Sequence, residues 1–132
     1  MTERKYTLSK AERLSWKRYI DLLFEKGESF VAFPLRVVFL ALSKEEELPA
    51  VSSILISVSK KKFKRAVKRN LVKRQVREAY RVRKYELIDS LACNDKKILV
   101  GFIYIEKEIK PFADIEKAMN KAIRLLKEKN GL

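Results

Sequence analysis

The sequence predicts an α+β fold in which helices cover a single sheet, mixed or antiparallel. Two kinds of pattern alternate along the 132 residues: stretches with apolar residues at helical spacing, and short apolar runs rich in β-branched and aromatic residues. Their order is α-β-β(-β)-α-β-α. The strand in brackets is present if a proline divides the first strand run into two strands. Only three Gly and three Pro occur and no stretch is repetitive, so we expect one domain over residues 1–132.

The first element is a helix from about Lys10 to Lys26. Ser9 followed three residues later by Glu12 is a capping-box pattern, and Gly27 is well placed as the residue just past the helix end. One face of this helix is apolar, and we interpret its members as core residues packed on the sheet: Trp16, Ile20, Leu23 and Phe24.

Two strand runs follow the first helix. The run from Phe30 to Leu42 contains Pro34, which cannot donate to a strand ladder and therefore belongs at a strand start, at an edge, or between two short strands. The polar residues 43–49 indicate a loop. Val51 to Val58 then alternates in part, which indicates a second long strand that leads directly into a strongly basic segment.

The second half of the chain predicts two helices around a buried strand. A long or broken helix begins near Ala66 and ends around Asn94, where turn residues collect. Lys97 to Ile105 is the most apolar run of the chain and indicates a buried strand. Pro111 suits the first turn of a last helix. The apolar face of that helix comprises Ile115, Ala118, Met119, Ala122, Ile123 and Leu126.

Positive charge is concentrated in residues 60–84. This segment holds thirteen basic residues against one acid, Glu78, so it carries +12 of the chain's +14. On a helix, one side is apolar and docks on the core: Val72, Val76, Ala79 and Tyr80. A second side is cationic and is expected to face outward: Asn70, Lys73, Arg74, Arg77, Arg81 and Lys84. Like charges at this spacing repel one another, so the stripe indicates binding to a polyanion rather than a merely solvated face.

The composition excludes the commoner protein active sites. The chain has no His and a single Cys93, so it forms no Ser-His-Asp or Cys-His site, no usual zinc site and no intrachain disulfide. We expect Cys93 to be a structural thiol and residues 45–47, all Glu, to form a solvated loop. No signal peptide or membrane-length apolar run is visible, which favours a soluble cytoplasmic protein.

Two neighbouring motifs resemble those of the protein subunit of bacterial ribonuclease P. That family has a strand ending in a Ser-Val-Ser-Lys-Lys-like sequence and then a helix with an Arg-Asn-Arg-x-x-Lys-Arg-like signature. Here the first stands as Ser57-Val58-Ser59-Lys60-Lys61, and the second as Arg69-Asn70-Leu71-Val72-Lys73-Arg74. The order of the other elements also fits the family, so the resemblance covers most of the chain.

The resemblance implies a fold and a function. The fold is a single mixed sheet covered by helices, of the ribosomal protein S5 domain 2-like kind, with a left-handed crossover. The function is that of a non-catalytic subunit in tRNA processing. In this ribonucleoprotein endonuclease a catalytic RNA with bound magnesium removes the 5′ leader of precursor tRNA, while the protein binds that RNA and the leader. No cofactor of the protein alone, no DNA and no membrane partner are implied.

The resemblance also assigns residues to two surfaces. The residues implied to bind RNA are Lys60, Lys61, Lys68, Arg69, Asn70, Lys73, Arg74, Arg77 and Arg81. Those implied to border the leader cleft are Ser57, Ser59, Ile20, Phe24 and Val38. Three positions depart from the family pattern: Leu71 replaces an arginine, Ile20 an aromatic residue and Val38 a tyrosine. These departures affect stacking on the leader more than docking of the catalytic RNA.

Two other functions fit the composition. One is a structural RNA-binding protein of ribosomal type, with the same fold and no role in cleavage. The other is a nuclease with its own carboxylate metal site, although no convergent acidic group is visible. Cleavage assays with and without a ribonuclease P RNA discriminate among the three.

Overall fold

The computed structural model describes residues 17–43 and 52–132, which form three helices and four strands. The first half contains α1 (Lys17–Lys26), β1 (Glu28–Ala32), β2 (Leu35–Ser43) and β3 (Ser52–Val58). The second half contains α2 (Ala66–Cys93), β4 (Lys96–Tyr104) and α3 (Phe112–Lys129). The predicted capping box, Trp16, the start of the first helix and the acidic residues 45–47 lie outside the described residues.

The four strands form one mixed sheet in the order β1-β2-β4-β3. β1 pairs with β2 and β2 with β4 in antiparallel fashion, whereas β3 lies parallel to β4. The predicted α+β fold with a single mixed sheet is therefore confirmed. α2 is the connection between the parallel strands β3 and β4. The left-handed sense of that crossover stays an expectation from the family resemblance.

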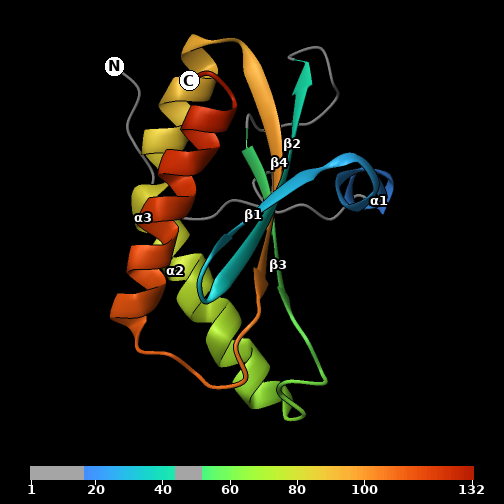
Figure 1. Cartoon of the computed structure of the whole chain (residues 1–132), viewed down its shortest axis with the longest axis vertical. Coiled ribbons are helices and arrows are strands. Elements are labelled where there is room, and N and C mark those ends of the chain that lie inside the picture. The colour runs from blue at the N-terminus through green and yellow to red at the C-terminus, as the bar shows by residue number, and fades with distance from the viewer. Residues whose placement is uncertain (1–16, 44–51) are drawn as a thin grey trace.

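The helices cover both faces of the sheet (Figure 1). α2 and α3 pack side by side on one face, and α1 lies on the other. Alternating strand residues divide between two cores: Val37 and Phe102 face α2 and α3, while Val38 and Leu99 lie in the smaller core beneath α1. The larger core includes every residue predicted for the apolar face of α3. Burial on both faces explains why the β4 sequence is almost continuously apolar.

Pro34 lies between β1 and β2 and divides the predicted first strand run into two strands. This is one of the alternatives that the sequence predicted. The bond between Phe33 and Pro34 is cis and lies in the turn of this hairpin, where no ladder hydrogen bond is lost. α2 is one unbroken helix of 28 residues. Pro111 stands immediately before α3, one residue earlier than a first-turn position.

Two predictions from helical periodicity are wrong, and so is the expectation that Cys93 is a structural thiol. Lys84 does not face outward but is 1% exposed, because about 40° separates it from Tyr80 on the helix and that places it at the edge of the core face. Phe24 is 48% exposed, since Tyr19 and Leu23 occupy the centre of the α1 core face. Cys93 is exposed at the end of α2, so its thiol does not pack in the core.

Candidate nucleic-acid interface

A short, ordered turn carries the chain from β3 into α2. The backbone N–H groups of Lys62 and Phe63 donate to the Ser59 carbonyl oxygen at 3.3 and 3.1 Å, and the Lys61 N–H donates to Ser59 Oγ at 3.1 Å. The Phe63 ring is 5% exposed and packs against Tyr104, with 5.9 Å between ring centroids. Lys60 and Lys61 are thus exposed on a turn that is anchored in the core.

Arg69 holds this turn against the start of α2. Its Nη1 donates to the carbonyl oxygens of Phe63 and Lys64, both at 2.8 Å, and the residue is only partly exposed. Carbonyl groups that precede a helix are otherwise satisfied by water or a ligand. The arginine predicted to bind RNA therefore has a structural role in shaping the neighbouring basic turn.

The outward face of α2 presents unpaired polar and cationic side chains. Asn70, Arg74 and Arg77 are exposed and Lys73 is partly exposed. Within the described part of the chain, none of these four side chains has a hydrogen bond or an ion pair. We call them, together with Arg81, the α2 stripe.

Arg81 differs from the rest of the stripe because it is paired. Its Nε and Nη2 donate to the two carboxylate oxygens of Glu78 at 2.9 and 2.5 Å. The hydrogen bond from Arg81 lowers the pKa of the Glu78 carboxyl below its usual 4.5 and raises the pKa of Arg81. The pair therefore adds stability above pH 4.5 and loses it as the pH falls through the lowered pKa of Glu78.

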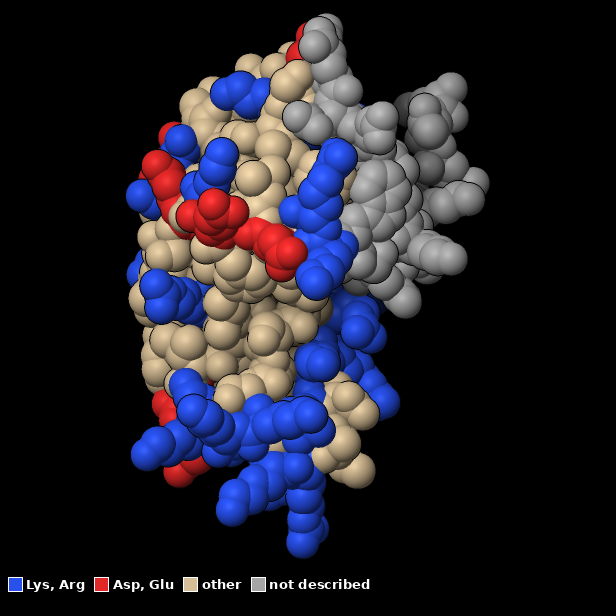
Figure 2. Space-filling view, turned by 90° about the vertical axis from the view of Figure 1, so that its right-hand side faces the viewer, with Lys and Arg blue, Asp and Glu red and all other residues tan. Residues whose placement is uncertain are grey.

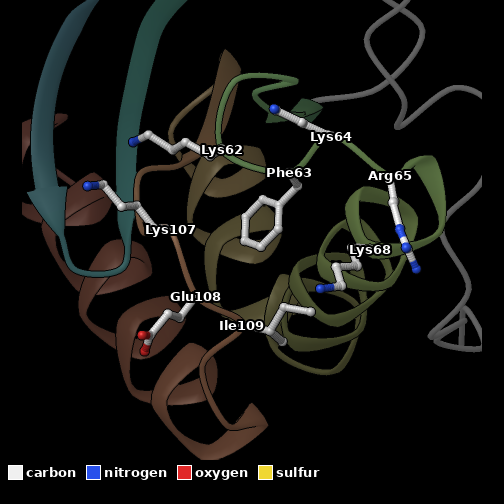
Figure 3. A pocket seen from close by; sticks show the side chains of 8 residues that line it. All are labelled: Lys62, Phe63, Lys64, Arg65, Lys68, Lys107, Glu108 and Ile109. Atoms are coloured by element: carbon white, nitrogen blue, oxygen red, sulfur yellow. The ribbon is translucent and has the colours of Figure 1, made fainter.

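Lys68 lies on a different side of α2 from the stripe. It lines an open hollow of about 540 Å³ between the start of α2 and the connection from β4 to α3 (Figure 3). The predicted RNA-binding residues are therefore not one continuous row: the stripe runs along α2, whereas Lys60, Lys61 and Lys68 cluster at its beginning. Figure 2 shows Lys and Arg side chains gathered at the lower end of the molecule, where Figure 1 places the β3–α2 connection.

The residues predicted to border a leader cleft lie on the α1 side of the sheet. Phe24 lies over Gly101: a Cβ atom on that glycine would stand 3.8 Å from Phe24 Cζ, and 48% of Phe24 is exposed. Val38 is 8% exposed and belongs to the smaller core, on which Ile20 packs. Ser57 is partly exposed on β3 and Ser59 stands in the turn beyond it.

Sequence reasoning missed Arg36 on this face. Strand pairing places Arg36 opposite Ile103, and Ile103 opposite Ser57, so the three side chains form one row across the sheet. Arg36 is exposed, and its Nη2 lies 3.4 Å from Ser29 Oγ. Alternation along β2 was the available signal, since Arg36 is two residues before Val38 and shares its side of the strand.

Metal-ligand clusters and membrane-spanning helices are both absent from the described part of the chain. No group of three or more His, Cys, Asp or Glu side chains in residues 17–43 and 52–132 is placed to hold a metal ion. No helix there is long and apolar enough to cross a membrane.

The fold and the site together define a small, strongly basic α+β protein with a cationic helix face. A family model described as Ribonuclease P matches residues 8–127. The protein component of ribonuclease P from Porphyromonas gingivalis is 45% identical over 118 residues, covering 89% of this chain and 85% of that protein. The Chlorobaculum tepidum component is 32% identical over 107 residues, covering 77% of this chain and 70% of that protein. The chain belongs to the family of bacterial ribonuclease P protein components.

Solved structures of the family share the fold. The Staphylococcus aureus ribonuclease P protein superimposes with a TM-score of 0.65 at 25% identity, covering 89% of this chain and 97% of that one. The Thermotoga maritima protein superimposes with a TM-score of 0.66 at 24% identity, covering 86% and 96%. The predicted resemblance is confirmed, and with it the role of a protein subunit of the ribonuclease P endonuclease in tRNA processing.

Proposed function

We propose that this subunit docks the catalytic RNA of ribonuclease P on the α2 stripe and the adjoining basic turn. We propose further that it holds the 5′ leader of precursor tRNA against the α1 side of the sheet. The RNA, with magnesium bound to it, hydrolyses the phosphodiester, and the protein contributes no reacting group. The expected location of the complex is the cytoplasm.

The unpaired charge of the α2 stripe is the observation that carries this proposal. Arg77 lies one helical turn beyond the adjacent Lys73 and Arg74 on the same face, and no carboxylate in the described residues pairs with any of the three. Their mutual repulsion costs a few tenths of a kcal/mol per pair, which phosphates would relieve. Guanidinium groups donate in a planar fork that fits phosphate oxygens, and Asn70 adds an amide for sugar hydroxyls.

The α1 side supplies different chemistry, suited to a single strand. Phe24 offers an exposed ring on which one base can stack. Ser57 offers a hydroxyl and Arg36 a cation, and both belong to the row that runs across the sheet through Ile103. Val38 is buried in the smaller core, so its side chain offers no surface on which a base can stack. The two proposed surfaces lie on different sides of the molecule, which lets one subunit contact two RNAs at once.

Cleavage of 5′-labelled precursor tRNA by a bacterial ribonuclease P RNA at low magnesium tests the proposed function. We expect cleavage to be stimulated when protein and RNA are present together, with none by protein alone. Binding without stimulation would instead support the structural, ribosomal-type alternative. Cleavage by the protein alone would contradict an RNA-based active site.

A further inference from the structure

We infer that the hollow between the start of α2 and the β4–α3 connection is a second binding site for the phosphate backbone of the catalytic RNA, separate from the α2 stripe. This inference rests on the proposed function and extends the RNA contact beyond the residues that the family signature covers. The hollow is lined by Lys62, Phe63, Lys64, Arg65, Lys68, Lys107, Glu108 and Ile109.

The charges of the hollow come from two parts of the chain that are far apart in sequence. Residues 62–68 contribute four cations, and Lys107 comes from the connection after β4. Five cationic side chains thus surround a space that has a single carboxylate, Glu108, in its lining. Figure 3 shows the Phe63 ring between Lys62 and Lys107 on one side and Lys68 and Arg65 on the other. A linear sequence motif could not report such a cluster.

Most of these cations have no partner. In the described residues, the side chains of Lys64, Arg65, Lys68 and Lys107 make no hydrogen bond and no ion pair. Arg81 and Arg83, by contrast, are paired with Glu78 and Glu116. A structural cluster of charges would be expected to recruit carboxylates in the same way, whereas an unneutralised cluster in a concave site favours an anionic ligand.

The two walls of the hollow are tied together, so the site is formed before any ligand arrives. Lys62 Nζ donates to the Ile105 carbonyl oxygen at 2.5 Å, which joins the basic turn to the β4–α3 connection. The Tyr104 hydroxyl donates to the Glu108 carbonyl oxygen at 2.6 Å and accepts from the Lys110 N–H at 3.0 Å. Phe63 packs on Tyr104 beneath them. Such preorganisation reduces the entropy cost of binding.

The ligand is best identified as RNA backbone. The lining offers ammonium and guanidinium donors, with Phe63 buried as its floor and no exposed aromatic ring for base stacking. Lys60 and Lys61 directly precede Lys62 in the wall of the hollow, so one RNA can follow the basic turn from the α2 stripe into it. Lys and Arg side chains gather at the lower end of the molecule, where the β3–α2 connection lies (Figure 2). Phosphate contacts of this kind position an RNA without reading its sequence.

The test compares two double variants of the full chain in titrations with a bacterial ribonuclease P RNA over a series of salt concentrations, without precursor tRNA. Lys68→Gln with Lys107→Gln removes one free cation from each wall. Lys121→Gln with Lys129→Gln removes the same charge from exposed positions on α3. We expect the first variant to bind about threefold to tenfold more weakly, with a log-log salt slope shallower by about 1.4 to 1.8, for two lost phosphate contacts. The α3 variant should keep the wild-type slope.

Arg74→Ala separates the possible failures. If Arg74→Ala weakens binding while the Lys68/Lys107 variant matches the wild type, the α2 stripe binds RNA and the second site is wrong. If neither change affects binding, the proposed function fails and the second site fails with it. Circular dichroism checks the fold of each variant, and all substituted side chains are exposed.

Directed cleavage gives a second readout that does not depend on affinity. A Cys93→Ser background removes the only thiol, and an iron chelate is then attached at Lys107→Cys or at Lys121→Cys. Hydroxyl radicals released at position 107 should cut a discrete segment of the bound RNA, and those released at position 121 should not. An uncut RNA backbone with the chelate at 107 would overturn the inference.

Discussion

Arginine residues on α2 take different roles because they contact different groups. Arg69 donates to two backbone carbonyls of the preceding turn, and Arg83 joins α2 to α3 through Glu116 at 2.6 Å. Arg81 is held by Glu78, whereas Arg74 has no partner in the described residues. Charge alone therefore does not identify a ligand-binding arginine. The unpaired ones are available to phosphates, and the paired ones stabilise the scaffold that presents them.

Glu78→Gln should strengthen binding to the catalytic RNA. This substitution releases Arg81 from its ion pair and removes the one acid between residues 60 and 84. We expect affinity about threefold higher and a log-log salt slope steeper by about 0.7 to 0.9, equivalent to one added phosphate contact. Filter binding over a salt series measures both quantities.

Glu86→Gln is the matched control for Glu78→Gln. Glu86 is an exposed acid on the same helix, two turns further on and about 160° away from the centre of the stripe. The Glu86→Gln substitution changes the net charge of the protein by the same amount as Glu78→Gln, but it frees no residue of the α2 stripe. Equal gains from both substitutions would show that overall charge, rather than Arg81, is responsible.

At the scale of elements, the junction between α1 and β2 depends on Gly27. Gly27 follows the last residue of α1, and its N–H donates to the Leu23 carbonyl oxygen at 2.8 Å. A Cβ atom on Gly27 would stand 2.3 Å from that oxygen and 3.0 Å from the Phe39 carbonyl oxygen. Both atoms are backbone and cannot rotate away, so the glycine is required for close approach of the helix to the sheet.

Gly27→Ala should destabilise the protein and displace α1. Overpacking of this kind costs about 1 to 3 kcal/mol, which corresponds to a fall in Tm of several degrees in a domain of this size. Thermal unfolding followed by circular dichroism measures the shift. Gly101→Ala serves as the control, because its nearest neighbour would be the flexible end of Leu23 at 3.4 Å. A Gly27→Ala protein as stable as Gly101→Ala would contradict the assigned role.

At the scale of the whole molecule, the charge of +14 is spatially organised. Exposed cations collect at the end where β3 enters α2 and where β4 leads to α3 (Figures 1 and 2). Beyond residues 60–84 the chain carries 18 basic and 16 acidic residues, so the rest contributes little net field. A focused field of this kind directs a polyanion to one end and raises its association rate.

Binding to the catalytic RNA should therefore depend steeply on salt. If Lys60, Lys61, Lys73, Arg74 and Arg77 each contact one phosphate, the log-log slope is expected to be about −3.5 to −4.5. Contacts in the second site would make the slope steeper still. Titrations between roughly 0.1 and 0.5 M monovalent salt measure it over a range in which screening is substantial. A slope near zero would contradict phosphate-dominated docking.

The sequence by itself determined the class of fold and the location of the charge. Apolar periodicity depends on residues three or four apart in a helix and two apart in a strand. These local spacings can be read directly from the sequence. They predicted the strand runs, the continuous run of β4, the apolar face of α3 and the basic segment that β3 leads into. The motif around Asn70 added the family, which the comparisons confirm.

The tertiary structure alone decided which charges are available and which side chains meet. Lys84 and Arg77 have neighbouring positions around the α2 helix, yet in the folded chain Arg77 is exposed and Lys84 is 1% exposed. The ion pair of Arg83 with Glu116, and the hollow that both Lys68 and Lys107 line, bring together residues more than thirty positions apart. Such contacts depend on strand order and helix placement, which local spacing does not encode, and so the second cationic site emerges only in the folded chain.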